Sequence, residues 1–277
     1  MSDTLLTCVP PIRRARGYRL YAMDNRRFLD LWQWGGRAVL GHTAPRLLTT
    51  LKNLASRGLF APLPHPSLRR LERALEGFFP GRTVRIYADE ASADRALAMA
   101  GYGPLEVHDF MDPAVSILHG TVPFPRGCLW RPWLDDQSFE GVEVLAPIIP
   151  LPWASAPIAL AFRHGETGSV PPSDLIPPLI AAAAAQGIYD MAALLKKGSP
   201  PSFRRTMEAL ASCSWKLHGI YLSPLNPWTE DAYELFFKRA LAGGILIPPR
   251  SDIPMILPRE ISPGEDAALA RVLHFEP

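Results

Sequence analysis

The sequence predicts an α/β protein, and two features carry this prediction. The stretch from Val144 to Phe162 contains no charged residue, yet prolines interrupt it repeatedly. It therefore fits two short buried strands, around Val142–Ala146 and Ile158–Phe162, joined by a Pro-rich turn. Amphipathic helices are predicted on both sides of it, for example at Ala44–Arg57. Buried strands between helices are typical of an α/β domain.

The composition is that of an ordinary globular protein. The chain has 277 residues, of which 48% are hydrophobic and 20% charged, and its net charge is +2. This balance argues against binding to nucleic acid or to an anionic membrane surface. Prolines in the uncharged stretch argue against a membrane span, and the first residues lack a signal-peptide pattern. We therefore expect a cytoplasmic protein.

The N-terminal part predicts a hairpin followed by alternating helices and a strand. Tyr18–Asp30 alternates and then turns, as a β-hairpin does. In Ala44–Arg57 the leucines recur at helical spacing, and Pro66–Phe79 has a similar stripe opposite charged residues. We expect a strand at Thr83–Tyr87 and an Ala-rich helix at Ala91–Ala100. Beyond these, Leu105–Phe139 shows no clean period.

The C-terminal part predicts four helices and several short strands. A run of alanines in the first helix would let it pack closely on a sheet, and N-terminal caps are expected for the last two helices. The expected helices are Pro172–Leu195, Pro201–Trp215, Thr229–Ala242 and one that opens at Ser262-Pro263-Gly264-Glu265, and the expected strands are Gly219–Leu222 and a strand pair formed by Ile245–Ile247 and Met255–Leu257.

The two ends of the chain carry patterns that occur together in one enzyme family. Gly17–Pro45 contains the hairpin ending in Phe28-Leu29-Asp30, then Gly-rich sequence, then Leu40-Gly41-His42. Tyr233–Leu273 contains a helix, a glycine, strand residues, a Pro-Pro-Arg-Ser turn and the final capped helix. These segments resemble class III aminotransferases, the group that includes glutamate-1-semialdehyde aminomutase. Members of this family are fold type I enzymes that use pyridoxal phosphate (PLP).

The resemblance implies a shortened fold type I protein. It predicts a reduced α/β large domain at residues 81–198 and a small α+β domain built from both chain ends. Residues 1–80 would form the N-terminal part of the small domain with linking helices, and residues 199–277 its C-terminal part. The resemblance also implies a homodimer, because the family is dimeric with its sites at the subunit interface.

The phosphate-binding segment of the family is altered here. In the family, small residues and backbone N–H groups at a helix start bind the PLP phosphate. The matching segment is Ala88–Ser92, and the phosphate-binding glycine falls on Asp89. A carboxylate about 4 Å from a phosphate charge costs roughly 4 kcal/mol per charge pair at an effective dielectric of about 20. We therefore expect Asp89 and Glu90 to cap the helix instead, with Ser92 in its first turn.

The residues that would react with PLP are also altered. Counting back from Ala156-Pro157-Ile158, which resembles a family segment, the Schiff-base lysine falls at or near Pro150. The Asp that the family places against the pyridine nitrogen could only be Asp135 or Asp136. None of the lysines lies in the required strand–turn context, and Lys216 is the hardest of them to dismiss; they are Lys52, Lys196, Lys197, Lys216 and Lys238.

Other chemistries find little support. The histidines show no metal-ligand spacing, and Cys8, Cys128 and Cys213 lie too far apart in sequence to suggest a metal or redox motif. A hydrolase set would have to combine His108-Asp109, Ser116 and His119, whose geometry nothing in the sequence fixes. Five tryptophans are expected in the core or at a dimer interface rather than in a ligand cage; they are Trp32, Trp34, Trp130, Trp133 and Trp153.

Two functional hypotheses follow. In the first, the chain is a pseudoenzyme that has lost PLP catalysis and acts through binding or assembly, as a homodimer that also engages a small molecule or an enzyme partner. In the second, it is still an aminotransferase- or aminomutase-type enzyme with PLP in a non-standard site.

Overall fold

The structure, a computed structural model, describes residues 5–115, 126–134, 139, 141–163, 170–197 and 203–274. The chain divides into two compact units. Unit 1 combines the described residues up to Thr43 and from Phe203 onward with Trp133 and Leu134. Unit 2 comprises the other described residues between Ala44 and Lys197. Residues 44–80, which the sequence analysis grouped with residues 1–43, belong to unit 2.

Unit 2 is built on a four-stranded sheet. Its order is β4 (Arg82–Tyr87), β7 (Ile158–Arg163), β6 (Val144–Pro147) and β5 (Gly127–Trp130). Strand β7 runs antiparallel to both β4 and β6, and β5 runs parallel to β6. Strands β4, β5 and β6 therefore run in one direction and end at the same edge of the sheet. The two strands predicted around the uncharged turn are confirmed as β6 and β7.

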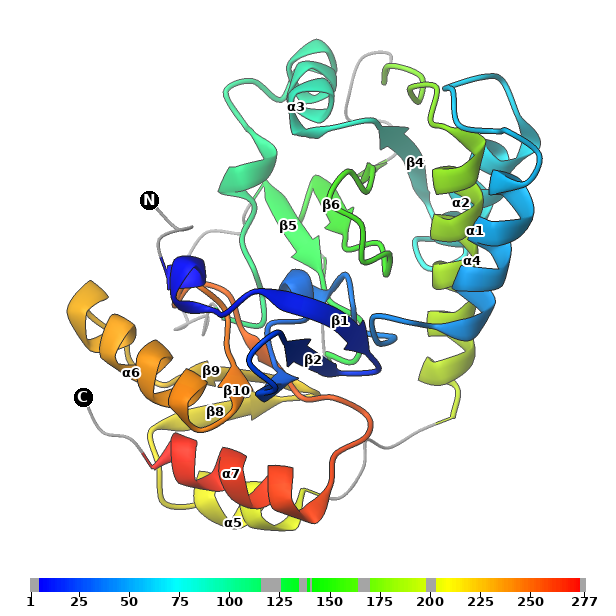
Figure 1. Cartoon of the computed structure of the whole chain (residues 1–277). Helices are drawn as coiled ribbons and strands as arrows, with labels where there is room; N and C mark the ends of the chain where they lie inside the picture. Colours follow the sequence, from blue (N-terminus) through cyan, green and yellow to red (C-terminus); the bar gives the residue numbers. More distant parts are fainter. Residues whose placement is uncertain are drawn as a thin grey trace. The chain divides into compact units, whose positions relative to one another are not determined.

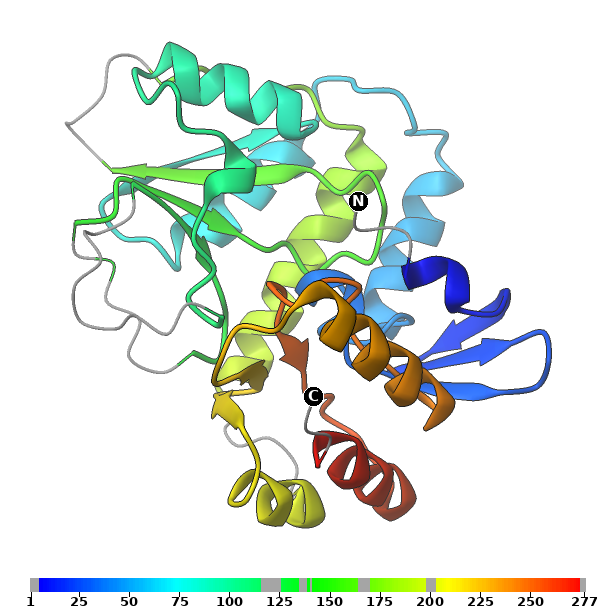
Figure 2. The same ribbon diagram turned by 90° about the vertical axis from the view of Figure 1, so that its left-hand side faces the viewer.

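Helices cover both faces of this sheet. Helices α1 (Pro45–Ala55), α2 (Pro66–Glu76) and α4 (Pro178–Leu195) pack together on one side, as Figure 1 shows. Helix α3 (Glu90–Met99) covers the other face, where it joins a core with side chains of β4, β6 and β7 (Figure 2). A short 3-10 helix, η3 (Val107–Asp109), follows it.

Helix α4 packs closely against the turn that follows β6. A Cβ on Gly187 would lie 2.5 Å from the carbonyl oxygen of Pro150, so only glycine leaves room for the turn after β6. Among the described residues, α4 is also the one helix long and apolar enough to cross a membrane, by length and composition alone. More than half of it is buried inside the protein, as expected for a core helix.

Unit 1 brings together the two ends of the chain. Its four-stranded sheet has the order β1 (Ile12–Arg16), β2 (Arg19–Ala22), β3 (Arg27–Asp30) and β10 (Ile245–Leu246), and β10 pairs in parallel with β3. A three-stranded sheet has the order β11 (Met255–Ile256), β9 (Tyr221–Pro224) and β8 (Trp215–His218). The helices are η1 (Leu5–Cys8), η2 (Gln33–Gly36), α5 (Arg204–Leu210), α6 (Glu230–Ala242) and α7 (Pro263–Leu273).

Local sequence patterns were correct where they describe turns and caps. The predicted hairpin is confirmed as β2 and β3, and its turn places Asn25 at a φ of 67°. Thr229 caps α6, and Ser262 and Glu265 form the predicted capping box of α7. Glu265 also accepts hydrogen bonds from Arg19 at 2.7 Å, which attach α7 to β2.

The predicted pairing of Ile245–Ile247 with Met255–Leu257 is wrong. Strand β10 pairs with β3, and β11 pairs with β9, so neighbours in sequence join different sheets. A pattern of apolar residues shows that a segment is buried but does not show which strand it pairs with. The strand predicted at Gly219–Leu222 lies at Tyr221–Pro224, and its partner β8 was missed.

Two predicted helices are shorter than expected. Helix α4 begins at Pro178 rather than Pro172. A proline disfavours helical backbone in the residue before it, and Pro177, which precedes Pro178, has a ψ of 128°. Helix α5 ends at Leu210, and Trp215 already belongs to β8. There its ring packs against Trp228 and Phe236, so burial of an aromatic side chain outweighs helix propensity.

We predict that Gly187→Ala lowers the stability of the protein. Alanine favours a helix interior by up to about 1 kcal/mol, but relief of the clash with Pro150 requires a backbone shift that costs typically 1–3 kcal/mol. The urea denaturation midpoint measures the result. Gly77→Ala is the control, because its Cβ would have 3.7 Å to the nearest atom. Equal midpoints for the two variants would contradict the close contact.

Candidate functional site at the carboxyl edge of the unit 2 sheet

One edge of the unit 2 sheet is the natural place to look for a site. In open α/β sheets, ligands bind beyond the carboxyl ends of the strands. The chain segments that leave β4, β5 and β6 at this edge carry Asp89, Arg131 and Pro150, respectively. Two of these are positions that the sequence analysis singled out, so the fold brings the predicted positions to one edge.

Asp89 is the N-cap residue of α3. Its backbone is extended, and its carboxylate accepts a hydrogen bond from the backbone N–H of Ser92 at 2.8 Å. Hydrogen bonds from Ser92 lower the pKa of Asp89, so the carboxylate is ionised at neutral pH. The predicted cap is confirmed for Asp89, whereas Glu90 only contributes its charge to the first turn. At the position that resembled a phosphate-binding glycine, the negatively charged Asp89 side chain therefore occupies the N-terminus of α3.

A buried ion pair follows the end of β5. The Arg131 side chain is 3% exposed and that of Asp112 12%, and their two-pronged contact includes an Arg131 Nε to Asp112 Oδ1 distance of 3.1 Å. Asp112 Oδ1 also accepts a hydrogen bond from the backbone N–H of Ala114 at 3.1 Å. Such bidentate, charge-assisted contacts are the strong ones in proteins, so both charges are satisfied internally.

Sequence reasoning missed this pair. It took Leu129–Leu134 as the hydrophobic strand and the following Asp135 or Asp136 as the residue at its end. The strand β5 ends at Trp130 instead, and the residue that follows it is Arg131. The isolated bridge between Met111 and Cys128 brings Asp112 alongside. Asp135 and Asp136 lie outside the described residues.

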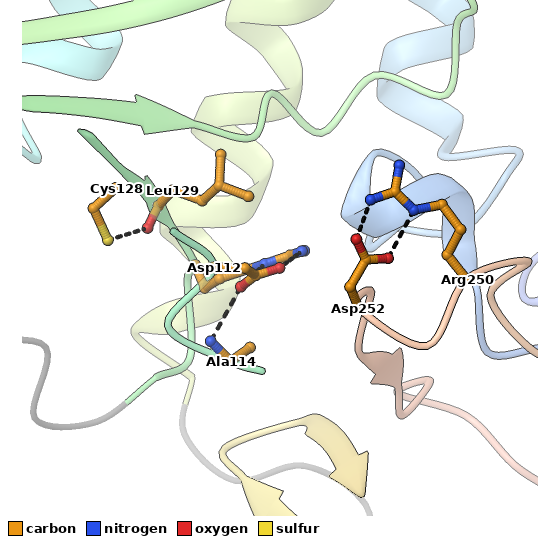
Figure 3. Close-up of polar contacts among 7 residues, drawn as sticks. Asp112, Ala114, Cys128, Leu129, Arg250 and Asp252 are labelled. Carbon is orange, nitrogen blue, oxygen red and sulfur yellow. Dashed lines mark hydrogen bonds and ion pairs between the residues drawn. The ribbon is translucent and has the colours of Figure 1, made fainter. Parts of the chain in front are cut away.

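The neighbouring Cys128 is buried. Burial, together with the Asp112 carboxylate, raises the pKa of the Cys128 thiol to about 12. The reactive form of cysteine is the thiolate, which is scarce at neutral pH under these conditions. Its Sγ lies 3.3 Å from the carbonyl oxygen of Leu129 (Figure 3).

The turn after β6 is packed into the unit. Ile149 and Leu151 on either side of Pro150 are each 1% exposed, and Pro150 itself is buried beside Gly187. Backbone hydrogen bonds from Leu151 to Ile149 and from Trp153 to Leu151, both 2.8 Å, tighten the turn. The position that resembled the Schiff-base lysine position therefore serves packing.

The lysines lie elsewhere, and all of them are in the described part of the chain. Lys216 is half-buried on β8 of unit 1, opposite Ser223. The others are exposed on helices or at a helix end; they are Lys52 on α1, Lys196 and Lys197 after α4, and Lys238 on α6.

The hydrolase hypothesis combined His108-Asp109 with Ser116 and His119, and the last two residues lie outside the described part of the chain. His108 is exposed, and it contacts Glu106 at 3.1 Å and Asp109 at 3.3 Å through opposite ring nitrogens. One ligand atom from each of Glu106, His108 and Asp109 lies within 4.8 Å of the others, but all three residues are exposed, and exposed acidic groups commonly gather without a metal ion.

We predict that Arg131→Met destabilises the protein by about 3 kcal/mol, because it leaves the Asp112 carboxylate buried without its partner. Arg126→Met is the matched control, since Arg126 forms an exposed ion pair with Glu143 at 2.9 Å and exposed pairs contribute about 1 kcal/mol or less. Urea denaturation of both variants measures the difference. A similar decrease in the free energy of unfolding in the two variants would show that the buried pair of Arg131 stabilises the protein no more than the exposed pair of Arg126 does.

Comparisons with known sequences find a few relatives of this chain. No family model matches it. An uncharacterized protein of Treponema pallidum is 28% identical over 292 residues, which cover 89% of this chain and 88% of that protein. A glutamate-1-semialdehyde 2,1-aminomutase of Syntrophus aciditrophicus is 32% identical over 69 residues, or 25% of this chain and 16% of that enzyme.

Solved structures extend the likeness to nearly the whole chain. Ornithine δ-aminotransferase of Plasmodium falciparum superimposes with a TM-score of 0.64 at 15% identity, covering 95% of this chain and 92% of that one. N-acetylornithine aminotransferase of Stenotrophomonas maltophilia gives a TM-score of 0.62 at 15% identity, covering 98% and 97%. The predicted fold class is confirmed: the chain has the fold of the class III aminotransferases.

Proposed function

We propose that this chain retains the aminotransferase fold without the PLP reaction and acts through binding or assembly. The observation that carries the proposal is Pro150. A Schiff base needs a primary amine, which proline lacks, and Pro150 is buried against Gly187. The lysines of unit 2 are exposed on α1 and after α4.

The polar groups at the sheet edge also do not fit PLP. The Asp89 carboxylate occupies the α3 N-terminus, where a phosphate would meet a like charge. The family resemblance requires a carboxylate at the end of the strand before the lysine, to pair with a protonated pyridine nitrogen. Arg131 follows β5 instead, and the nearby Asp112 carboxylate is already paired with Arg131. Lys216, the least unlikely lysine in the alternative of a PLP enzyme, belongs to unit 1.

We further propose that the protein is a cytoplasmic homodimer. The connection between α1 and α2 supports assembly, because Phe60 and Leu63 are 58% and 54% exposed and all residues from Phe60 to Pro64 are exposed. Contiguous exposed apolar side chains often mark contact surfaces. A small-molecule or enzyme partner would add to this assembly.

We predict that PLP forms no Schiff base with this protein. After incubation with equimolar PLP and reduction with borohydride, peptide mapping by mass spectrometry should find no lysine carrying the pyridoxyl group. An ornithine aminotransferase treated in parallel serves as the positive control. A stoichiometric adduct on Lys216, or on any other single lysine, would overturn the loss of cofactor chemistry.

We predict that Phe60→Ser combined with Leu63→Glu converts the dimer to a monomer, because a charge at an apolar contact must be buried unpaired. Light scattering coupled to size-exclusion chromatography measures the mass. Met99→Glu is the control, since Met99 lies in the same unit outside this connection and is 74% exposed. A monomeric unsubstituted chain, or loss of the dimer in the control alone, would contradict the proposal.

A further inference from the structure

A strained turn follows β3 in unit 1. Gln33 and Trp34 have φ values of 46° and 52°, in the left-handed region that residues other than glycine rarely adopt. The φ values of the next two residues, Gly35 and Gly36, are also positive. The Asp30 carboxylate, which is buried, holds the turn by accepting hydrogen bonds from the backbone N–H groups of Trp32 and Gln33, both at 2.9 Å. Backbone strain of this kind persists only where the surroundings enforce it, and it gathers at functional sites.

Arg37, at the end of this turn, has no partner in the described part of the chain. Its side chain is half-buried and forms no hydrogen bond or ion pair with any described residue. Burial lowers the pKa of Arg37, and no neighbouring charge offsets this effect. A desolvated cation without a counter-charge is costly, so this position is suited to an anion that comes from outside the chain.

The same turn holds a second buried polar atom without a partner. Gln33 is 1% exposed, and its amide nitrogen donates to the carbonyl oxygen of Ile256 at 2.9 Å. Its amide oxygen is buried and accepts no hydrogen bond. Exchanging the amide oxygen and nitrogen would set two acceptors against each other, so the unsatisfied atom is an acceptor.

Between these two residues lies an exposed aromatic face. Trp34 stacks on Trp32 with a ring-centroid distance of 5.2 Å and an interplanar angle of 18°, yet 45% of Trp34 is exposed. A tryptophan held in a defined orientation by its neighbour offers a surface on which a planar group can stack. The turn therefore combines an unpaired cation, a buried acceptor and an aromatic surface within five consecutive residues.

We propose that the turn from Gln33 to Arg37 binds a small planar molecule that carries an oxyanion, either a carboxylate or a phosphate. Arg37 pairs with the oxyanion through its planar guanidinium, and Trp34 stacks on the body of the molecule. The inference rests on the proposed binding role and supplies a site for it. The residues concerned all belong to unit 1.

Calorimetric titration of the PLP-free protein tests this site with three probes at constant ionic strength. Benzoate carries a carboxylate on a flat ring, inorganic phosphate is an oxyanion without a ring, and benzamide keeps the ring without the charge. We expect benzoate or phosphate to bind and benzamide not to bind. Tighter binding of benzoate than of phosphate would assign the carboxylate, and the reverse order the phosphate.

Variants connect the binding to the turn. Arg37→Met should weaken binding of the anion by roughly tenfold or more, the value of one lost charge-assisted hydrogen bond, and Arg37→Lys should retain part of it. Arg13→Met is the matched control, because Arg13 is an exposed arginine of the same unit. If Arg37→Met does not fold, Trp34→Ala replaces it and should weaken benzoate but not phosphate.

The outcome separates the site from the proposed function. Binding of neither anion to the unsubstituted chain, or equal binding by Arg37→Met and Arg13→Met, would overturn the site. A reduced PLP–lysine adduct would overturn the loss of cofactor chemistry and leave the anion measurements unaffected.

Discussion

The close approach of Pro150 to Gly187 is the contact on which unit 2 depends. A glycine inside a helix weakens it, and here the carbonyl oxygen of Pro150 occupies the space that any Cβ would need. The contact holds the turn after β6 against α4, and it keeps Ile149 and Leu151 in the core. A lysine at position 150 would have to bury an ammonium group there.

The carboxyl edge of the sheet is polar, but its charges are satisfied from within. Asp89 bonds to the N-terminus of its own helix, and Arg131 pairs with Asp112 in the interior. A ligand that entered there would have to replace existing hydrogen bonds rather than complete missing ones. The turn at Gln33–Arg37 is the opposite case, because it contains a cation and an acceptor that no described residue satisfies. The ligand site that we propose therefore lies in unit 1.

Sequence patterns predicted the local structure well and the non-local pairing poorly. The caps of α6 and α7 were correct because they are built from residues three positions apart. The pairing of β10 with β3 was missed because those strands come from opposite ends of the chain. Of the candidate site, the cap at Asp89 followed from one residue and its helix. The Arg131–Asp112 pair did not, because β5 lies in a stretch without periodicity.

The sequence by itself determined the α/β class, the N-terminal caps of α6 and α7, the turn that lacks a lysine and the resemblance to aminotransferases, since each depends on residue types at short spacing. Only the tertiary structure decided which strands pair, that β5 ends at an arginine, and that Arg37 has no partner among the described residues. The physical reason is that burial and ion pairing depend on residues far apart in sequence. Whether a charge is paired becomes visible only when those residues are placed in space.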